Sequence, residues 1–139
     1  MSSRTSTDQT LSSEIAALLD SNGAGGTPLR MAMLFGSRAS GRARAGSDVD
    51  LAVLADRRLG GEEVLALMND IAARTSLAVD VVDLFDLPQP VTAEALGGTR
   101  LLGDETTFAD TVARNAAMYE DFGRLRERVL ADRRRELLD

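Results

Sequence analysis

Residues 30–55 read RMAMLFGSRASGRARAGSDVDLAVLA, with two apolar segments on either side of a segment rich in Gly, Ala and Arg. The stretch begins with a short apolar run at 30–35, which predicts a buried strand. Gly36 breaks the run, and residues 38–47, rich in Gly, Ala and Arg, predict a short helix followed by a turn. The alternating residues 48–55 predict a second strand.

This second strand places two carboxylates side by side. Asp48 and Asp50 leave the same face of the strand, while the apolar residues next to them face the other way. Two carboxylates held this close repel each other unless a cation lies between them or one takes up a proton. A pair of divalent ions needs bridging carboxylates of this kind. Asp48 and Asp50 are therefore candidate metal ligands and catalytic residues.

A third carboxylate is expected from the next strand. Residues 77–85 are apolar and β-branched, which is typical of a strand. Asp80 is placed to supply the carboxylate, but Asp80 and Asp83 lie on opposite faces of this strand. Periodicity alone does not decide which of the two faces the site.

The residues around the strand break are candidate nucleotide ligands. Backbone N–H groups at a helix start, together with a Ser hydroxyl, form a phosphate site, and Gly36-Ser37 has this character. Arg38 and Arg42 lie within reach and can neutralise phosphate charge. Ser47 is a further candidate for nucleotide binding, or it is a turn residue. The stretch predicts a metal-bound polyphosphate, held by the turn at one end and by cations on the aspartates at the other.

The composition restricts acid–base and metal chemistry to carboxylates. The 139 residues include no Cys, no His and no Lys. Thiolate zinc sites, imidazole bases, a Walker A loop and Schiff-base chemistry are therefore excluded. Carboxylates and water suit hard cations such as Mg²⁺. The net charge of −6 makes direct nucleic-acid binding unfavourable.

The pattern along the chain predicts one domain. Residues 1–10 are expected to be a flexible polar tail and residues 11–139 a single domain. An apolar run of about 20 residues, which a membrane span needs, is missing. The N-terminus lacks the apolar region of a signal peptide. We therefore expect a cytoplasmic protein.

The order of the predicted elements indicates an α/β (α+β) fold. We expect a small mixed sheet of three to four strands, helices packed on one face, and a long C-terminal helix. Besides the strands above, the periodicity predicts helices at 11–20 and 61–75, a helical turn at 91–97, a weak strand at 99–102 and an amphipathic helix at 105–137. Phe108 and Val112 belong to the apolar stripe of the last helix.

Gly36-Ser37, ten residues, and Asp48-Val49-Asp50 together fit G-S-x₁₀-D-x-D. This spacing resembles the signature of the polymerase β-like nucleotidyltransferase superfamily. The fuller pattern, LFGSRASGRARAGSDVDLAV with VDVVDL downstream, is similar to the minimal nucleotidyltransferase (MNT) group, the MntA-like antitoxins of HEPN/MNT toxin–antitoxin modules. The resemblance covers residues 30–103 well and the C-terminal helix loosely. The chain departs from the group at Ser40, where the group often has Arg.

The resemblance implies a nucleotidyltransferase fold and a Mg²⁺-dependent transfer of AMP from ATP. The implied acceptor is a hydroxyl, a Tyr, on a cognate HEPN ribonuclease toxin, which the protein would inhibit as the antitoxin of a hetero-oligomer. It also implies that Asp48 and Asp50 hold two Mg²⁺ ions and favours Asp80 as the third carboxylate. Gly36 and Ser37 would bind the β- and γ-phosphates.

Two other functions stay open. The protein could transfer a nucleotide to a small molecule such as an aminoglycoside, although such enzymes usually carry a further domain. It could also be a non-catalytic antitoxin that neutralises its partner by binding through the C-terminal helix. The presence of three carboxylates favours an active enzyme.

Overall fold

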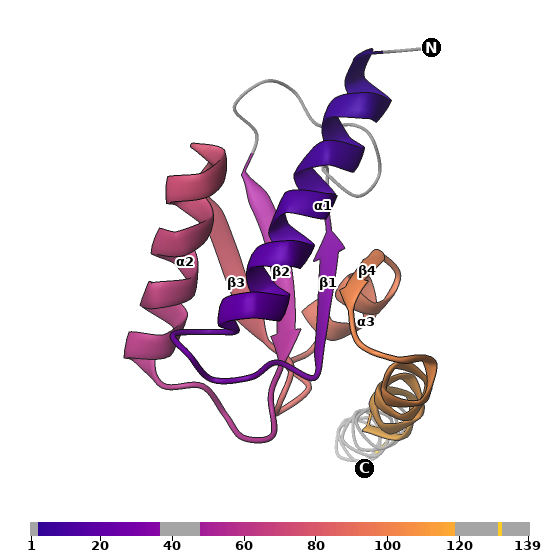
Figure 1. Cartoon of the computed structure of the whole chain (residues 1–139). Coiled ribbons are helices and arrows are strands. Elements are labelled where there is room, and N and C mark those ends of the chain that lie inside the picture. Colours follow the sequence, from indigo (N-terminus) through magenta and orange to yellow (C-terminus); the bar gives the residue numbers. More distant parts are fainter. Residues whose placement is uncertain (1–2, 37–47, 119–130, 132–139) are drawn as a thin grey trace.

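The computed structural model of the chain describes residues 3–36, 48–118 and 131 (Figure 1). Its elements are α1 (Ser3–Asn22), β1 (Met31–Phe35), β2 (Val49–Leu54), α2 (Gly61–Thr75), β3 (Val79–Asp83), α3 (Val91–Leu96) and β4 (Thr99–Leu102). A further helix begins at residue 105 and is described to residue 118. The rest of the helix predicted at 105–137, apart from the helical residue 131, falls outside the described residues. The α/β class is confirmed.

The predicted elements correspond closely to the observed ones. Helix α2 and strand β4 have the bounds that the sequence predicts. Strands β1, β2 and β3 are slightly shorter than the predicted segments. Among the described residues, no helix is long and apolar enough to cross a membrane.

Helix α1 is longer than the sequence predicts. It begins at Ser3, so most of the segment 1–10, for which a flexible tail was expected, is helical. The stripe predicted for residues 11–20 is buried, namely Leu11, Ile15, Leu18 and Leu19. The sequence before Leu11 is polar and has no apolar stripe, so an amphipathic pattern could not reveal the first turns of this helix.

The four strands form one mixed sheet in the order β3-β2-β1-β4. Strand β1 pairs antiparallel with both β2 and β4, while β2 pairs parallel with β3. A parallel pair needs a crossover connection, and α2 forms that connection between β2 and β3. The arrangement is visible in Figure 1, where α1 and α2 lie side by side over the sheet.

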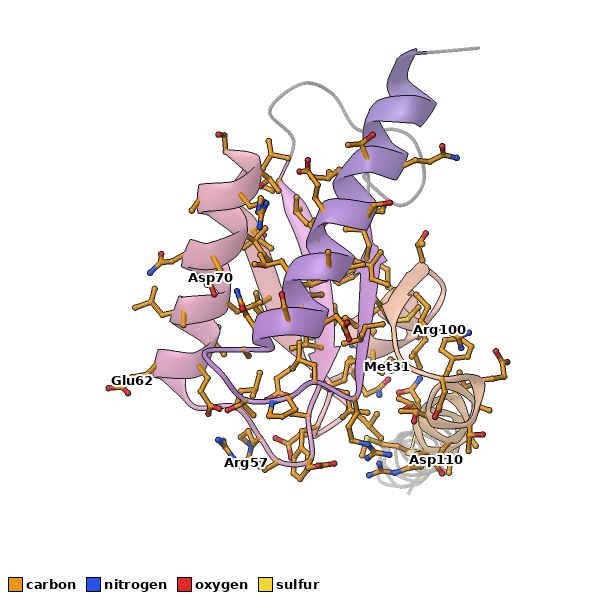
Figure 2. The ribbon with its side chains drawn as sticks, viewed as in Figure 1. Met31, Arg57, Glu62, Asp70, Arg100 and Asp110 are labelled. Carbon is orange, nitrogen blue, oxygen red and sulfur yellow. The ribbon has the colours of Figure 1, made fainter. Side chains whose placement is uncertain are left out.

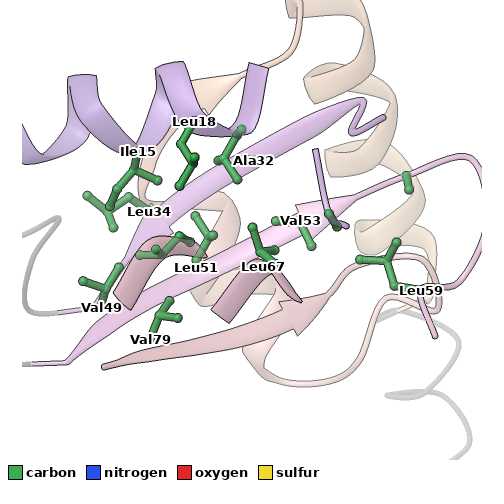
Figure 3. Packing of buried hydrophobic residues seen from close by; sticks show 14 of the residues in the cluster. Ile15, Leu18, Ala32, Leu34, Val49, Leu51, Val53, Leu59, Leu67 and Val79 are labelled. Atoms are coloured by element: carbon green, nitrogen blue, oxygen red, sulfur yellow. The ribbon is translucent and has the colours of Figure 1, made fainter. Parts of the chain in front are cut away.

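Helices α1 and α2 pack on one face of the sheet. Figure 3 shows the side chains buried there, among them Ile15, Leu18, Ala32, Leu34, Val49, Leu51, Val53, Leu67 and Val79. Every second residue of β1 and β2 contributes to this cluster, as the pleat of a strand requires. The predicted alternation of β2 is therefore confirmed.

A second cluster lies on the opposite face of the sheet. It consists of Met31, Met33, Phe35, Ala52, Leu54, Leu84 and Ala95. The sequence predicted helices on one face, which holds for α1 and α2, but α3 covers part of the other face through Ala95. The reason is that β1 is buried at every position and has no polar residue, so both of its faces need apolar cover.

The helix that begins at residue 105 turns a different side inward from the one predicted. Phe108 packs against the second cluster, but Val112 is 40% exposed, while Thr111 and Asn115 are buried. The Gln89 side-chain amide donates hydrogen bonds to Asn115 Oδ1 and, at 2.9 Å, to the Leu87 carbonyl oxygen. The hydrogen bond to Gln89 allows the polar Asn115 to be buried. The apolar pattern had predicted that Val112 would be on the buried side of the helix.

An ion pair ties α2 to the loops at its N-terminal end. The Arg57 guanidinium donates to both carboxylate oxygens of Glu63, at 2.7 and 2.8 Å. The Gly60 N–H donates to the same carboxylate at 2.8 Å, and the Thr27 hydroxyl donates to it as well. The hydrogen bond from Arg57, followed by those from Thr27 and Gly60, lowers the pKa of Glu63 from 4.5 to about 2.

This lowered pKa makes stability depend on pH. The unfolded chain binds a proton at Glu63 more readily than the folded protein does, so the stabilisation is complete above about pH 4.5 and is lost as the pH falls towards 2. We expect the urea midpoint of the wild-type protein to fall further between neutral pH and about pH 3 than that of Glu63→Gln.

Glu62→Gln is the matched control for this measurement. Glu62 lies in the same first turn of α2, apart from Arg57 (Figure 2). No hydrogen bond or ion pair links its side chain to another described residue. It should keep the pH dependence of the wild-type protein. An unchanged pH dependence in Glu63→Gln would show that the ion pair is not the source.

Candidate active site

The register of the sheet brings two of the predicted carboxylates together. Asp50 of β2 is paired with Asp80 of β3 and, on its other side, with Phe35 of β1. Residues paired across neighbouring strands point to the same face. Asp50 and Asp80 therefore share the face of Phe35 and Ala52, opposite α1 and α2. Asp48 lies directly before β2, and we call Asp48, Asp50 and Asp80 the carboxylate corner.

Gly36, directly after β1, lies against the Asp50 carboxylate of this corner. Its φ of +75° lies in the left-handed region, which favours glycine. A Cβ atom added to Gly36 would overlap Asp50 Oδ2 and lie 3.1 Å from Asp50 Cγ. A larger residue at this position would be strained by the positive φ and would push the Asp50 carboxylate aside.

The carboxylate corner combines a partly buried Asp50 with like charges around it. Asp48 and Asp80 are exposed, whereas Asp50 is partly buried. Burial raises the pKa of Asp50 above its ordinary value, and the charges of Asp80, Glu94 and Asp48 raise it further, in that order. A cation placed among these groups would relieve the repulsion that raises the pKa.

Sequence reasoning missed Glu94. It belongs to α3, and its closeness to Asp50 depends on where α3 packs on the sheet. The sequence shows only a short helical turn at this place. No signal in the residues themselves separates Glu94 from the other exposed acids of the chain.

Asp83, the alternative to Asp80, is placed elsewhere. It is paired with Val53, which belongs to the α1–α2 face of the sheet. One oxygen of its carboxylate accepts a hydrogen bond from the Leu59 N–H at 2.8 Å, and the other accepts from the Phe85 N–H at 3.0 Å. The structure thus brings Asp80, and not Asp83, next to Asp50.

The remaining predicted nucleotide ligands lie outside the described residues. These are Ser37, Arg38, Arg42 and Ser47, all within the segment 37–47. The helix and turn predicted for residues 38–47 lie outside them too. Of the predicted phosphate-binding turn, the structure describes Gly36.

The donor chemistry of the corner suits a hard cation. Carboxylate oxygens are the ligands that Mg²⁺ prefers. Within residues 3–36, 48–118 and 131, however, no three acidic side chains already converge on a common point where they could hold a metal ion. Magnesium is commonly held by one or two carboxylates together with substrate phosphates. The corner therefore has the groups for a metal–nucleotide site, with part of the coordination left to the nucleotide.

Comparison with known proteins identifies the fold. A family model described as polymerase beta, nucleotidyltransferase matches residues 14–107. No curated protein sequence matches the chain significantly.

Solved structures match nearly the whole chain. A crystal structure of a toxin-antitoxin with AMP-PNP is 26% identical with a TM-score of 0.75, covering 87% of this chain and 96% of that chain. A tri-AMPylated Shewanella oneidensis HEPN toxin in complex with its MNT antitoxin matches at 24% identity and a TM-score of 0.71, covering 90% and 97%. The toxin-antitoxin MntA-HepT matches at 24% identity and a TM-score of 0.70, covering 89% and 97%. The last two show similarity of fold.

The contact between Gly36 and Asp50 can be separated from backbone strain. Gly26 also has a positive φ, +91°, but a Cβ atom there would meet nothing within 4 Å. We expect Gly26→Ala to cost about 1–2 kcal/mol through strain, and Gly36→Ala roughly 2 kcal/mol more because the new methyl group displaces the carboxylate. Chemical denaturation measures both variants. Equal losses would mean that the Asp50 contact contributes nothing.

Proposed function

Because the chain belongs to the polymerase beta nucleotidyltransferase family, we propose that it transfers AMP from ATP to a Tyr hydroxyl of a HEPN-domain toxin and so acts as the antitoxin. The observation that carries the proposal is the register that sets Asp80 beside Asp50 at the Gly36 turn. The similarity to a toxin-antitoxin with AMP-PNP and to an AMPylated HEPN toxin with its MNT antitoxin supports the nucleotide and the acceptor by analogy. We also propose a cytoplasmic location, because ATP, the proposed donor, is available there.

The proposed reaction is an in-line substitution at the α-phosphorus of ATP. A bond forms between the acceptor oxygen and the α-phosphorus, and the bond from the α-phosphorus to the oxygen bridging to the β-phosphate breaks. Pyrophosphate leaves with that electron pair. The chain has no His and no Lys, so a carboxylate is the available base, and we assign the acceptor's proton to Asp80.

The residues around the corner would orient the nucleotide. Gly36 and Ser37 would donate backbone N–H groups to the β- and γ-phosphates. The side chains of Arg38, Arg42 and Ser47 would neutralise or hydrogen-bond the same phosphates. These assignments come from the sequence motif.

Two Mg²⁺ ions bound by Asp48, Asp50 and Asp80 would lower the pKa of the acceptor hydroxyl and balance the charge of the leaving pyrophosphate. The product carries a bulky, negatively charged AMP on the toxin's Tyr. The AMP group would block the active site of the toxin through its bulk and its negative charge, as other charge-adding modifications do.

The transfer assay uses the purified protein, the proposed HEPN-domain partner, Mg²⁺ and α-labelled ATP. We expect label and one or more AMP masses on the partner. In the Asp48→Ala, Asp50→Ala double variant the rate should fall by more than about 100-fold, because the metal ligands are lost. Toxin neutralisation by this variant without transfer would instead identify an antitoxin that acts by binding.

The third carboxylate is tested by a pair of substitutions. Asp80→Asn should lower the transfer rate as strongly as the loss of Asp48 and Asp50, while stability changes little because Asp80 is exposed. Asp83→Asn should retain transfer but unfold at a lower urea concentration, because its carboxylate accepts two backbone hydrogen bonds. The reverse pattern would assign the role to Asp83.

A further inference from the structure

Gly98 lies between α3 and β4, and its backbone packs directly onto the end of β1. A Cβ atom at Gly98 would overlap the Leu34 carbonyl oxygen and lie 2.9 Å from Phe35 Cβ. The first of these obstacles is backbone, and the second is bonded to it. Neither can move aside by a change of side-chain rotamer. A side chain at position 98 would therefore push the end of β1 and the segment 97–99 apart.

The segment around Gly98 is held on both sides and has little room to yield. The Gly98 N–H donates a hydrogen bond to the Ala95 carbonyl oxygen at 3.1 Å. Ala95 is completely buried in the second apolar cluster. On the other side, Thr99 begins β4 and is paired with Leu34 of β1. Because closely packed interiors transmit strain, a shift forced at Gly98 would reach the end of β1.

The end of β1 also determines where the Gly36 turn lies. Phe35, the last residue of β1, is paired with Asp50. Gly36 follows directly, and a Cβ atom there would overlap Asp50 Oδ2. The end of β1 is thus in close contact with Gly98 towards β4 and with Asp50 towards β2. Displacing it would change the position of the Gly36 turn relative to the Asp50 carboxylate.

We propose that Gly98 is a positioning residue of the candidate active site: because it has no side chain, β1 can end where the Gly36 turn lies against the Asp50 carboxylate. The inference rests on the proposed function, in which this turn binds the phosphates of ATP and Asp50 binds the metal. Gly98 touches neither ligand and acts by fixing the distance between the groups that hold them. A misplacement of about 1 Å in an active site can lower a rate by about 100-fold.

Gly103 provides a matched control at the other end of β1. A Cβ atom there would lie 2.7 Å from the Arg30 carbonyl oxygen and 3.1 Å from Met31 Cα, so it also overlaps the backbone. Met31 begins β1 (Figure 2) and lies about 13 Å along the strand from its last residue. The φ of Gly103 is +109°, which adds strain to the overlap. Gly103→Ala should therefore lower the stability of the protein as Gly98→Ala does, but away from the carboxylate corner.

Two further variants complete the set. Gly97→Ala is a neutral control, since a Cβ atom at Gly97 would lie 3.5 Å from the Glu94 carbonyl oxygen, an ordinary contact. Ala95→Gly removes the buried methyl group at the end of α3 and loosens the hold on Gly98 without creating an overlap. It is the milder variant and decides the question if Gly98→Ala does not fold.

The first measurement needs no nucleotide. In ¹H–¹⁵N NMR spectra, the amide resonances of Gly36 and Asp50 report the geometry of the turn. Gly98→Ala, and to a lesser extent Ala95→Gly, should move both resonances, whereas Gly103→Ala and Gly97→Ala should leave them in place. Unmoved resonances in Gly98→Ala, or in Ala95→Gly where Gly98→Ala does not fold, would overturn the inference. Equal movement in Gly103→Ala would do the same.

The second measurement is the transfer assay above, at a temperature at which circular dichroism shows each variant to be fully folded. We expect Gly98→Ala to lower kcat by about 100-fold, while Gly103→Ala and Gly97→Ala stay close to the wild type. A residue that only supports the fold would lose activity in proportion to stability, so parallel losses in Gly98→Ala and Gly103→Ala would overturn the inference. If the wild type transfers no AMP, the proposed function fails, and the NMR comparison still decides whether Gly98 positions the Gly36 turn.

Discussion

The register between β1, β2 and β3 fixes both the packing of the sheet and the position of the candidate site. It pairs Asp50 with Phe35 on one side and with Asp80 on the other. A slip of one residue would turn Asp50 towards α1 and α2 and move Val49, Leu51 and Val53 to the opposite face of the sheet. The hydrophobic face that holds the two helices therefore also fixes the direction of the carboxylates, so folding and site assembly follow from the same alternation.

Two glycines allow the backbone to pack closely around the end of β1, next to the carboxylate corner. At this end of the sheet, a Cβ atom on Gly36 would overlap the Asp50 carboxylate, and one on Gly98 would overlap the backbone of β1. The contact at Gly98 holds the segment after α3 against β1, whose Phe35 is paired with Asp50. Burial of Asp50, followed by the like charges around it, raises the pKa of this carboxyl group. A site that gathers like charges for a ligand generally lowers the stability of the protein when the ligand is absent. In this protein, the burial of β1 on both faces contributes stability that offsets this cost.

Much of the fold could be predicted because local sequence and tertiary structure agree. The alternation of β2, the periodicity of α2 and the bounds of β4 follow from the residues alone. The spacing from Gly36 predicts Asp48 and Asp50 as site residues, whereas the position of Asp80 beside Asp50 depends on the pairing of β3 with β2. Glu94 and the buried Asn115 depend on contacts between distant segments, which no periodicity contains. The assignments of Ser37, Arg38, Arg42 and Ser47 remain predictions.

A crystal structure with Mn²⁺ and a non-hydrolysable ATP analogue would show whether the carboxylate corner binds a metal–nucleotide complex. We expect an anomalous peak for the metal among the Asp48, Asp50 and Asp80 carboxylates, with the triphosphate extending to the Gly36 turn. A nucleotide bound with its metal away from these three carboxylates would contradict the account.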